Sequence, residues 1–231
     1  MTAHYDAYLV SGNLTIFCGT QTDDFKSDIL NSSLLAELLA TKTSNDREVS
    51  WPTYTETVQK IAWVSKSRTM QRTEFSYTTL LNTVIQCAGS ALPNPERQTL
   101  ANAFSELKNL PVDSVVIKTI TDKLKANASP YMGATAGVMT GVPFQTTMLL
   151  TIVRSDKTLL TLQIAFKTTD ATASSILGQP VLNAIKNGKT NMHLLCSSLD
   201  GRQSNLVRNE VIKKLGSKIE TDLLRIQAPT C

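Results

Sequence analysis

The spacing of apolar residues divides the chain into a helical first half and a strand-rich second half. Apolar positions recur at intervals of three and four in several segments, as in amphipathic helices. These segments are residues 22–42, 53–66, 73–89, 94–111 and 112–128. Asp23 or Asp24 can cap the N-terminus of the first predicted helix, and Pro52 suits the first turn of the second helix. Before these helices, two apolar runs flank residues 11–13, which predicts a hairpin turn.

The pattern changes at Pro130. No charged residue lies between 126 and 153, and β-branched residues dominate residues 145–153 and 158–169, which predicts a hairpin around residues 155–157. Residues 191–199 read as a third strand, and 204–224 as an amphipathic helix with Gly216 as a weak point. We therefore predict a single α+β domain over residues 1–231, with a mostly helical N-terminal half, an antiparallel β-sheet in the C-terminal half and a closing C-terminal helix.

Composition indicates a folded globular protein. Hydrophobic residues make up 42% of the 231 residues, charged residues 18%, and the net charge is +4. Disordered chains combine lower hydrophobicity with higher net charge. The basic residues are scattered rather than clustered with aromatic residues, so we expect no nucleic-acid partner. The start of the chain lacks a basic segment and contains Asp6, which is not typical of a secretory signal, and no transmembrane helix is evident.

Candidate catalytic chemistry is sparse. The histidines are His4 and His193, and His193 precedes Cys196 by three residues. On a strand, an odd offset directs two side chains to opposite faces, which disfavours a nucleophile–base pair. No two cysteines have zinc-ligand spacing, and the common nucleotide-binding and hydrolase motifs are absent. We therefore expect no enzymatic activity, no cofactor and no metal site.

A glycine repeat leaves the question of a membrane partner open. Gly133, Gly137 and Gly141 recur at every fourth position, as in closely packed membrane helices. Prolines, threonines and few long aliphatic residues in the same segment favour a strand or loop instead. Some pore-forming proteins nevertheless insert β-hairpins whose sequences resemble those of water-soluble proteins.

Aromatic residues bracket the second predicted helix. They are Trp51, Tyr54 and Trp63. Because aromatic side chains bury large areas, we expect them in the core. If they were exposed together, they would mark a contact patch.

Four cysteines offer a second kind of chemistry. A reducing compartment keeps them as thiols. We expect Cys196 to be buried, Cys87 to be half-buried, and Cys18 and Cys231 to be exposed because they lie in terminal segments. A terminal thiol can approach another molecule with little strain, since a disulfide needs Cα atoms within about 7 Å. Cys231 is therefore either an intermolecular cross-link or a tolerated free thiol.

The runs ILNSSLLAELLATK, SWPTYTETVQKIAWV and RNEVIKKLG resemble the OCTIN family of small proteins, found in mucoromycete fungi and, as virulence-like relatives, in bacteria. The resemblance implies a non-enzymatic protein that assembles with itself into an ordered crystal, which acts in the vacuole as a statolith for gravity sensing. It also implies disulfides between molecules, with Cys231, Cys18 and Cys87 as candidates. A fainter likeness to cytolytic Cyt-type toxins, in the order of helices and hairpin, motivates a pore-forming or virulence-type alternative.

Three hypotheses can be separated by simple observations. Concentration-dependent assembly that a reductant reverses would favour a self-assembling structural protein. Dye release from anionic vesicles would favour a membrane-active protein. A deep pocket with perturbed titratable groups would favour an enzyme, which we consider the weakest of the three.

Overall fold

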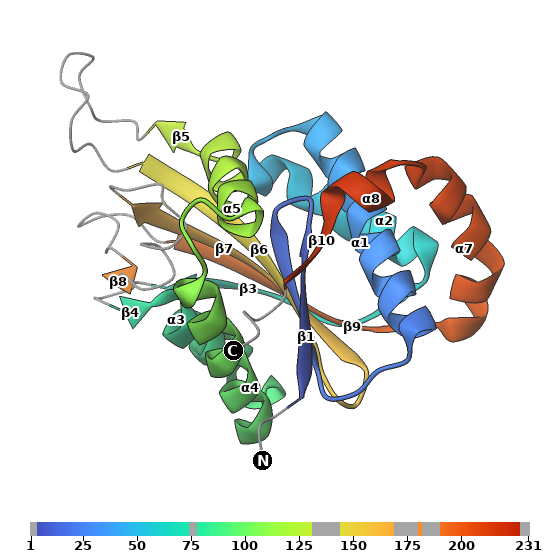
Figure 1. Ribbon diagram of the computed structural model, residues 1–231, viewed down its shortest axis with the longest axis horizontal. Coiled ribbons are helices and arrows are strands. Elements are labelled where there is room, and N and C mark those ends of the chain that lie inside the picture. Colours follow the sequence, from blue (N-terminus) through green and yellow to red (C-terminus); the bar gives the residue numbers. More distant parts are fainter. Residues whose placement is uncertain (1–3, 74–77, 131–143, 169–179, 182–189, 227–231) are drawn as a thin grey trace.

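A mixed β-sheet forms the centre of the computed structural model, with helices on both of its faces (Figure 1). The structure describes residues 4–73, 78–130, 144–168, 180–181 and 190–226. The predicted α+β class is confirmed. Helices dominate the first half of the chain, long strands follow, and short helical and strand segments close it.

The helices and strands have the following bounds. The helical segments are α1 (Asp23–Thr43), α2 (Arg47–Ile61), α3 (Leu80–Ala88), the 3-10 helix η1 (Gly89–Ala91), α4 (Asn94–Asn109), α5 (Val115–Ala126), α7 (Gly201–Leu215) and α8 (Lys218–Asp222). The strands are β1 (Tyr5–Val10), β2 (Asn13–Cys18), β3 (Trp63–Thr73), β4 (Thr78–Thr79), β5 (Ser129–Pro130), β6 (Phe144–Val153), β7 (Thr158–Thr168), β8 (Pro180–Val181), β9 (Thr190–Leu199) and β10 (Leu223–Ile226). The central sheet has the order β10-β1-β2-β6-β7-β9-β3, with β5 beside β6, while β4 and β8 pair separately.

Both predicted hairpins are confirmed. Ser11 and Gly12 have positive φ angles of 50° and 84°, as a two-residue type I′ turn requires, and they join β1 to β2. In the second hairpin, the Asp156 carboxylate accepts the Thr158 N–H at 2.9 Å, and β7 returns antiparallel to β6. Local turn chemistry thus fixes both hairpins.

One strand pair makes the sheet mixed rather than wholly antiparallel. β2 runs parallel to β6, with Leu14 opposite Leu150. A parallel pair needs a crossover connection, and here the chain from α1 to β5 provides it. The N-terminal hairpin thereby becomes part of the sheet that the second half of the chain builds.

The second helix starts earlier than its proline suggests. α2 begins at Arg47, because the Asp46 side chain caps it by accepting the Glu48 N–H at 2.9 Å. Pro52 consequently lies inside the helix, so the prediction that it occupies the first turn is wrong.

Strand β3 occupies residues that the apolar spacing assigns to a helix. α2 ends at Ile61, and the chain continues as a strand antiparallel to β9, with Trp63 opposite Leu199. The predicted helix over 53–66 is therefore wrong from Ala62 onward. Tertiary pairing with β9 outweighs the local helical spacing here.

The closing helix is also shorter than predicted. α7 ends at Leu215, and Gly216 follows with a φ of 53°, a conformation that glycine adopts without steric cost. After the short α8, β10 pairs with β1, with Leu224 opposite Leu9. Residues 223–224 were expected in the helix and instead extend the sheet.

The sheet separates two hydrophobic cores. One combines apolar residues of α3, α4 and α5 with Leu160 and Leu162 of β7. The other combines apolar residues of α1, α2 and α7 with Leu159 and Leu195. Because successive strand residues face opposite sides, β7 contributes to both cores.

Candidate functional site: an open edge of the sheet

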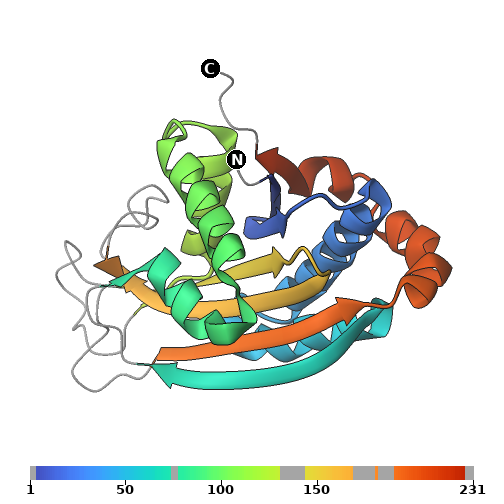
Figure 2. The same cartoon turned by 90° about the horizontal axis from the view of Figure 1, so that it is seen from below.

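Strand β3 forms one margin of the central sheet, next to β9 (Figure 2). It pairs with β9 from Trp63 opposite Leu199 to Thr73 opposite Thr190. No described strand pairs with its other edge. Every residue from 64 to 71 is exposed, and these residues point to both faces of the strand. Such an edge offers unpaired backbone N–H and C=O groups to a partner strand.

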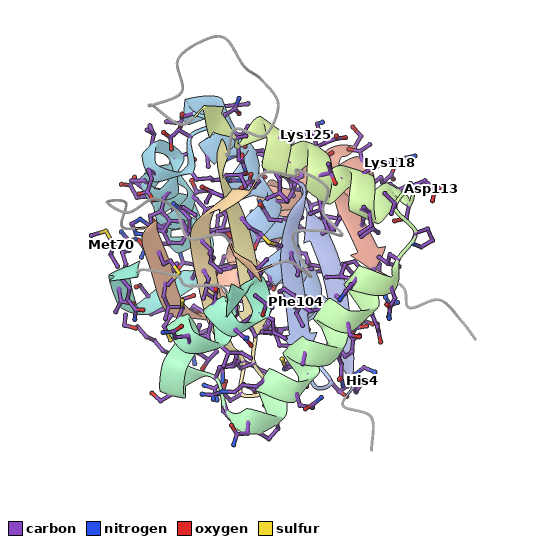
Figure 3. All side chains as sticks on the ribbon, turned by 90° about the vertical axis from the view of Figure 1, so that its left-hand side faces the viewer. His4, Met70, Phe104, Asp113, Lys118 and Lys125 are labelled. Carbon is purple, nitrogen blue, oxygen red and sulfur yellow. The ribbon has the colours of Figure 1, made fainter. Side chains whose placement is uncertain are left out.

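The charges on this edge are positive. Lys66 and Arg68 are exposed. Arg68 forms no ion pair with another described residue, whereas Lys66 interacts electrostatically with Asp156 of the β6–β7 turn. Arg72 follows in the same strand, which contains no aspartate or glutamate. Val64 and Met70 add apolar surface, being 49% and 55% exposed, and Figure 3 shows Met70 at the margin of the sheet. The edge therefore combines exposed apolar groups with positive charge that Asp156 offsets only in part, at Lys66.

Next to β3, His193 forms a small polar cluster with α2. His193 lies opposite Met70, and its Nε2 is 3.0 Å from Glu48 Oε2. The Gln163 side-chain amide donates to Glu48 Oε1 at 3.4 Å, and the Trp51 ring centroid lies 5.7 Å from that of His193. This cluster fixes α2 over the β9 side of the candidate edge.

The His193–Glu48 pair does not form a catalytic dyad with a nucleophile. A carboxylate that orients an imidazole is typical of general-base sites. Among the described residues, however, Glu48 is the hydrogen-bond partner of the His193 side chain, and no hydroxyl or thiol is bonded to it. Cys196 packs against the core on the opposite face, as the odd offset predicts.

A buried ion cluster lies near the β1–β2 turn. Glu37 has no exposed surface, accepts hydrogen bonds from Arg47 on both carboxylate oxygens, and lies 2.5 Å from Lys123 Nζ. Burial alone would raise the pKa of Glu37, but Arg47 and Lys123 outweigh burial and lower that pKa. Burial lowers the pKa of Lys123. Groups with shifted pKa values often mark active sites. The carboxylate oxygens of Glu37, however, are already bound by Arg47 and Lys123 of the same chain.

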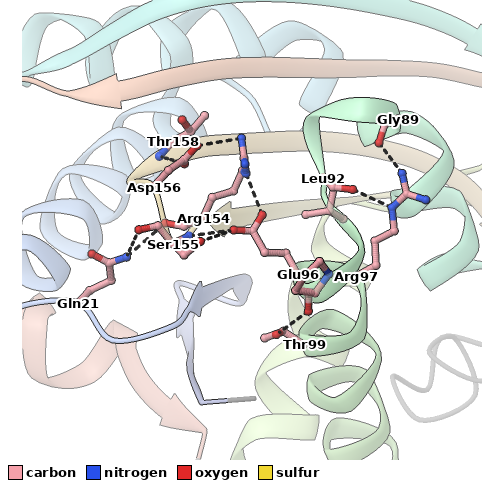
Figure 4. A network of polar contacts seen from close by, with 11 residues as sticks. Gln21, Gly89, Leu92, Glu96, Arg97, Thr99, Arg154, Ser155, Asp156 and Thr158 are labelled. Atoms are coloured by element: carbon pink, nitrogen blue, oxygen red, sulfur yellow. Dashed lines mark hydrogen bonds and ion pairs between the residues drawn. The ribbon is translucent and has the colours of Figure 1, made fainter. Parts of the chain in front are cut away.

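A second saturated carboxylate joins α4 to the β6–β7 turn (Figure 4). Glu96 accepts from Arg154 Nε at 2.8 Å and from the Ser155 N–H and hydroxyl at 3.0 and 2.8 Å. The Gln21 side chain donates to the carbonyls of Arg154 and Ser155 from the other side. This network holds the turn in place and engages Glu96 with three donors of its own chain, out of about four that a carboxylate can accept.

A cavity between α1 and α7 is too small for a substrate. Its volume is about 10 Å³, which suits roughly one water molecule. Asp28 and Arg208 line it and bind each other through two hydrogen bonds of 2.7 Å. This ion pair connects α1 to α7 and has a structural role.

The three cysteines that the structure describes, Cys18, Cys87 and Cys196, are free thiols. Cys18 and Cys87 are buried, at 2% and 6% exposure, so the expectations of an exposed Cys18 and a half-buried Cys87 are both wrong. Cys18 belongs to β2 rather than to a loose terminal segment. Cys196 is partly buried, and Cys231 lies outside the described residues. A disulfide from Cys18 or Cys87 to another molecule would require local opening of the fold, whereas the role of Cys231 stays a prediction.

The aromatic residues take core positions, as predicted. Trp51, Tyr54 and Trp63 are 5%, 1% and 2% exposed, and the rings of Trp51 and Tyr54 stack with centroids 5.9 Å apart. They form no surface contact patch. The glycine repeat at 133, 137 and 141 lies outside the described residues.

The described part of the chain holds no group of three or more histidine, cysteine, aspartate or glutamate side chains that could bind a metal ion. Within the same residues, none of the helices combines the length and the apolar character needed to cross a membrane.

Sequence reasoning missed Lys66 and Arg68 as candidate binding residues. Both lie in the segment assigned to the end of a helix, where they read as ordinary solvated positions. The one local signal was the alternation of small polar and cationic residues after Trp63, which fits an exposed strand as well as a helix end.

Comparisons with known proteins give distant similarities only. No protein-family model matches the chain, and neither does any curated protein. The solved structure of the Evf virulence factor is similar with a TM-score of 0.39 and 10% identity, over 92% of this chain and 82% of that one. A delta-endotoxin structure is similar with the same TM-score and 12% identity, over 82% and 83% of the two chains. At this level, the similarities carry no argument about function.

Proposed function

We propose that the protein is not an enzyme and that it acts by association through the open edge of β3. The observation that carries this proposal is the exposure of residues 64–71 on a strand whose outer edge has no described partner. Long exposed edges favour pairing with another chain, and most folded proteins shorten or cover them. In the part of the chain that the structure describes, no element covers this edge, and one β-bulge, at Lys66, interrupts it.

The state of the buried carboxylates supports a non-enzymatic role. Glu37, Glu96 and Asp28 are each engaged by cations or other donors of the chain itself. A catalytic acid or base must instead reach a substrate in a pocket. The cavity that Asp28 lines has room for about one water molecule.

The resemblance to the OCTIN family gives the proposal a more specific form. In this form, copies of the chain assemble into an ordered crystal that serves as a statolith in the vacuole, and Cys231 links neighbouring molecules by disulfides. The low share of charged residues, 18%, supports close packing of surfaces because fewer long side chains must be ordered. A contact between β3 and a different surface of the next copy would build an open assembly.

Sedimentation velocity over a hundredfold range of concentration tests self-assembly, with and without a reductant. We expect association that grows with concentration, and a reductant should weaken it in wild type but not in Cys231→Ser. Amide hydrogen exchange in residues 64–71 should slow as the protein associates. A monomer at every concentration would reject self-assembly, and unchanged exchange in an assembled sample would reject β3 as the contact.

A membrane-active, pore-forming or virulence-type protein is the second candidate. Lys66 and Arg68 lie in the same strand as the exposed Val64 and Met70, and such a combination attracts an anionic lipid surface. Dye release from phosphatidylserine vesicles, but not from neutral vesicles, would support this candidate. Vesicles of both kinds that stay intact would count against it.

A further inference from the structure

We infer that the β3 edge binds an acidic, extended segment of another protein, which adds as a strand to the central sheet. The inference rests on the proposed role of β3 as a binding edge and names the chemistry of its partner. In strand addition, main-chain hydrogen bonds supply affinity, and side chains along the added strand supply specificity.

The backbone of β3 is already held in the required conformation. It is paired with β9 along the strand, and β9 in turn pairs with β7. The register shifts at Lys66, between Ser65 and Ser67, so a β-bulge interrupts the pairing with β9 at one position. Beyond it, residues 67–71 form a regular exposed edge that a partner strand can follow without a prior rearrangement of the sheet.

The side chains of this edge select for negative charge. Arg68 lies opposite Leu195 and Met70 lies opposite His193 in the β9 register, so both face the α2 side of the sheet. A carboxylate placed across from Arg68 and an apolar side chain across from Met70 would match this alternation. β3 itself contains no carboxylate, and the Asp156 carboxylate of the β6–β7 turn interacts with Lys66, so Arg68 is the cation left for a partner strand.

A symmetric pairing of β3 with the β3 strand of a second copy is less favourable. In a symmetric antiparallel pair formed by residues 67–71, beyond the bulge, even-numbered residues lie opposite even-numbered residues. A two-fold axis at Arg68 would place that arginine opposite its own copy, and an axis at Thr69 would place it opposite Met70, which offers no negative charge. Like charges directly opposite each other destabilise strand pairs.

A lipid surface is also a poorer occupant of the edge. It can neutralise Lys66 and Arg68, but it supplies no row of N–H and C=O groups to pair with the open backbone of β3. An acidic polypeptide satisfies both the charge and the backbone.

Two capped, fluorescently labelled peptides test the inference on the full chain. One has the sequence of residues 64–71, and the other has the same sequence with Lys66→Glu and Arg68→Glu. By fluorescence anisotropy, we expect the acidic peptide to bind at least about tenfold more tightly than its cationic counterpart, and salt should weaken its binding.

In the protein, the double variant Lys66→Gln/Arg68→Gln should weaken acidic-peptide binding about five- to tenfold. The variant Lys213→Gln/Lys214→Gln removes the same charge from exposed positions on α7 and should bind like wild type.

Hydrogen exchange in residues 64–71 separates this inference from the proposed function on which it rests. Protection by the acidic peptide alone supports the inference. Equal protection by both peptides, or protection by phosphatidylserine vesicles without peptide binding, keeps β3 as a binding edge and overturns the acidic partner. No protection by any of these probes rejects the acidic partner, and if self-association also leaves the exchange unchanged, the proposed role of β3 is rejected as well.

Discussion

Glu37 on α1 and Lys123 on α5 form an ion pair of 2.5 Å, although their helices pack in different cores on opposite faces of the sheet. Arg47 of α2 binds the same carboxylate. The cluster thus connects both helical layers near the β1–β2 turn. It also contacts the N-terminal hairpin, because Arg47 donates to the Asn13 side chain at 3.5 Å and Lys123 packs against Gly12.

Removal of the Glu37 charge should destabilise the fold strongly. Glu37→Gln leaves Arg47 as a buried cation without a counterion and removes the ion-pair partner of the partly buried Lys123, so we expect the free energy of unfolding to fall by about 3–5 kcal/mol. Urea denaturation followed by circular dichroism measures the change. The control is Glu56→Gln, whose exposed pair with Lys60 is 3.9 Å long and should contribute at most about 0.5 kcal/mol. Equal losses in the two variants would contradict a structural role for the cluster.

Acid should weaken the fold through Asp6 as well as Glu37. Burial alone would raise the pKa of Asp6, but Lys26 and Arg225, at 2.8 and 2.7 Å, outweigh burial and lower it. A carboxylate with a lowered pKa in the folded state stabilises the protein above its ordinary pKa, and that stabilisation is lost as the pH falls through the lowered value.

Unfolding free energies measured at a series of pH values check this direction. They should decline from about pH 5 downward, and the decline should be shallower in Asp6→Asn. Lys26→Met should also make the decline shallower, because it removes a cation that lowers the pKa of Asp6. A decline as steep in Asp6→Asn as in wild type would show that Asp6 does not contribute.

Local chemistry made the hairpins and most helices predictable. Gly12 and Asp156 mark turns whose geometry depends on a few neighbouring residues. The helix starts were less predictable, because Thr22 caps α1 instead of Asp23 or Asp24, and Asp46 caps α2 ahead of Pro52. Strands β3 and β10 were not predictable in this way. Their assignment depends on pairing with β9 and β1, which lie far away in the sequence, whereas the local apolar spacing continued that of a helix.

The candidate site could not be predicted for the same reason, because it depends on strand pairing between distant parts of the sequence. Lys66 and Arg68 become distinctive only when β3 is known to be an edge strand. The Glu48–His193 contact joins residues 145 positions apart, and no local pattern signals it. The spacing of His193 and Cys196 was informative, because strand alternation alone predicts their opposite faces.

Gly12 should not tolerate a side chain. Its φ is 84°, and a Cβ atom there would lie 2.5 Å from the Cβ of Lys123. We expect Gly12→Ala to lower the free energy of unfolding by about 1–3 kcal/mol, from backbone strain and the clash together. Gly201→Ala is the matched control, because nothing lies within 4 Å of its Cβ position and its φ is not positive. If thermal denaturation shows the same midpoint for both variants, the close approach to Lys123 is not a constraint.

Thiol reactivity should divide the cysteines into buried and accessible groups. Burial raises the pKa of Cys18 and of Cys87 to about 12, so few thiolates form at neutral pH. Alkylation of both in the native protein should be at least about a hundredfold slower than in urea, as mass spectrometry of the peptides can show.

If Cys231 links molecules, non-reducing electrophoresis after rapid alkylation should give a ladder of oligomers that collapses in Cys231→Ser and persists in Cys18→Ser and Cys87→Ser. A ladder that persists in Cys231→Ser would assign the cross-link to another cysteine. A wild-type monomer whose four thiols are all alkylated once the protein is denatured in urea would remove disulfides from the assembly hypothesis and leave only non-covalent contacts.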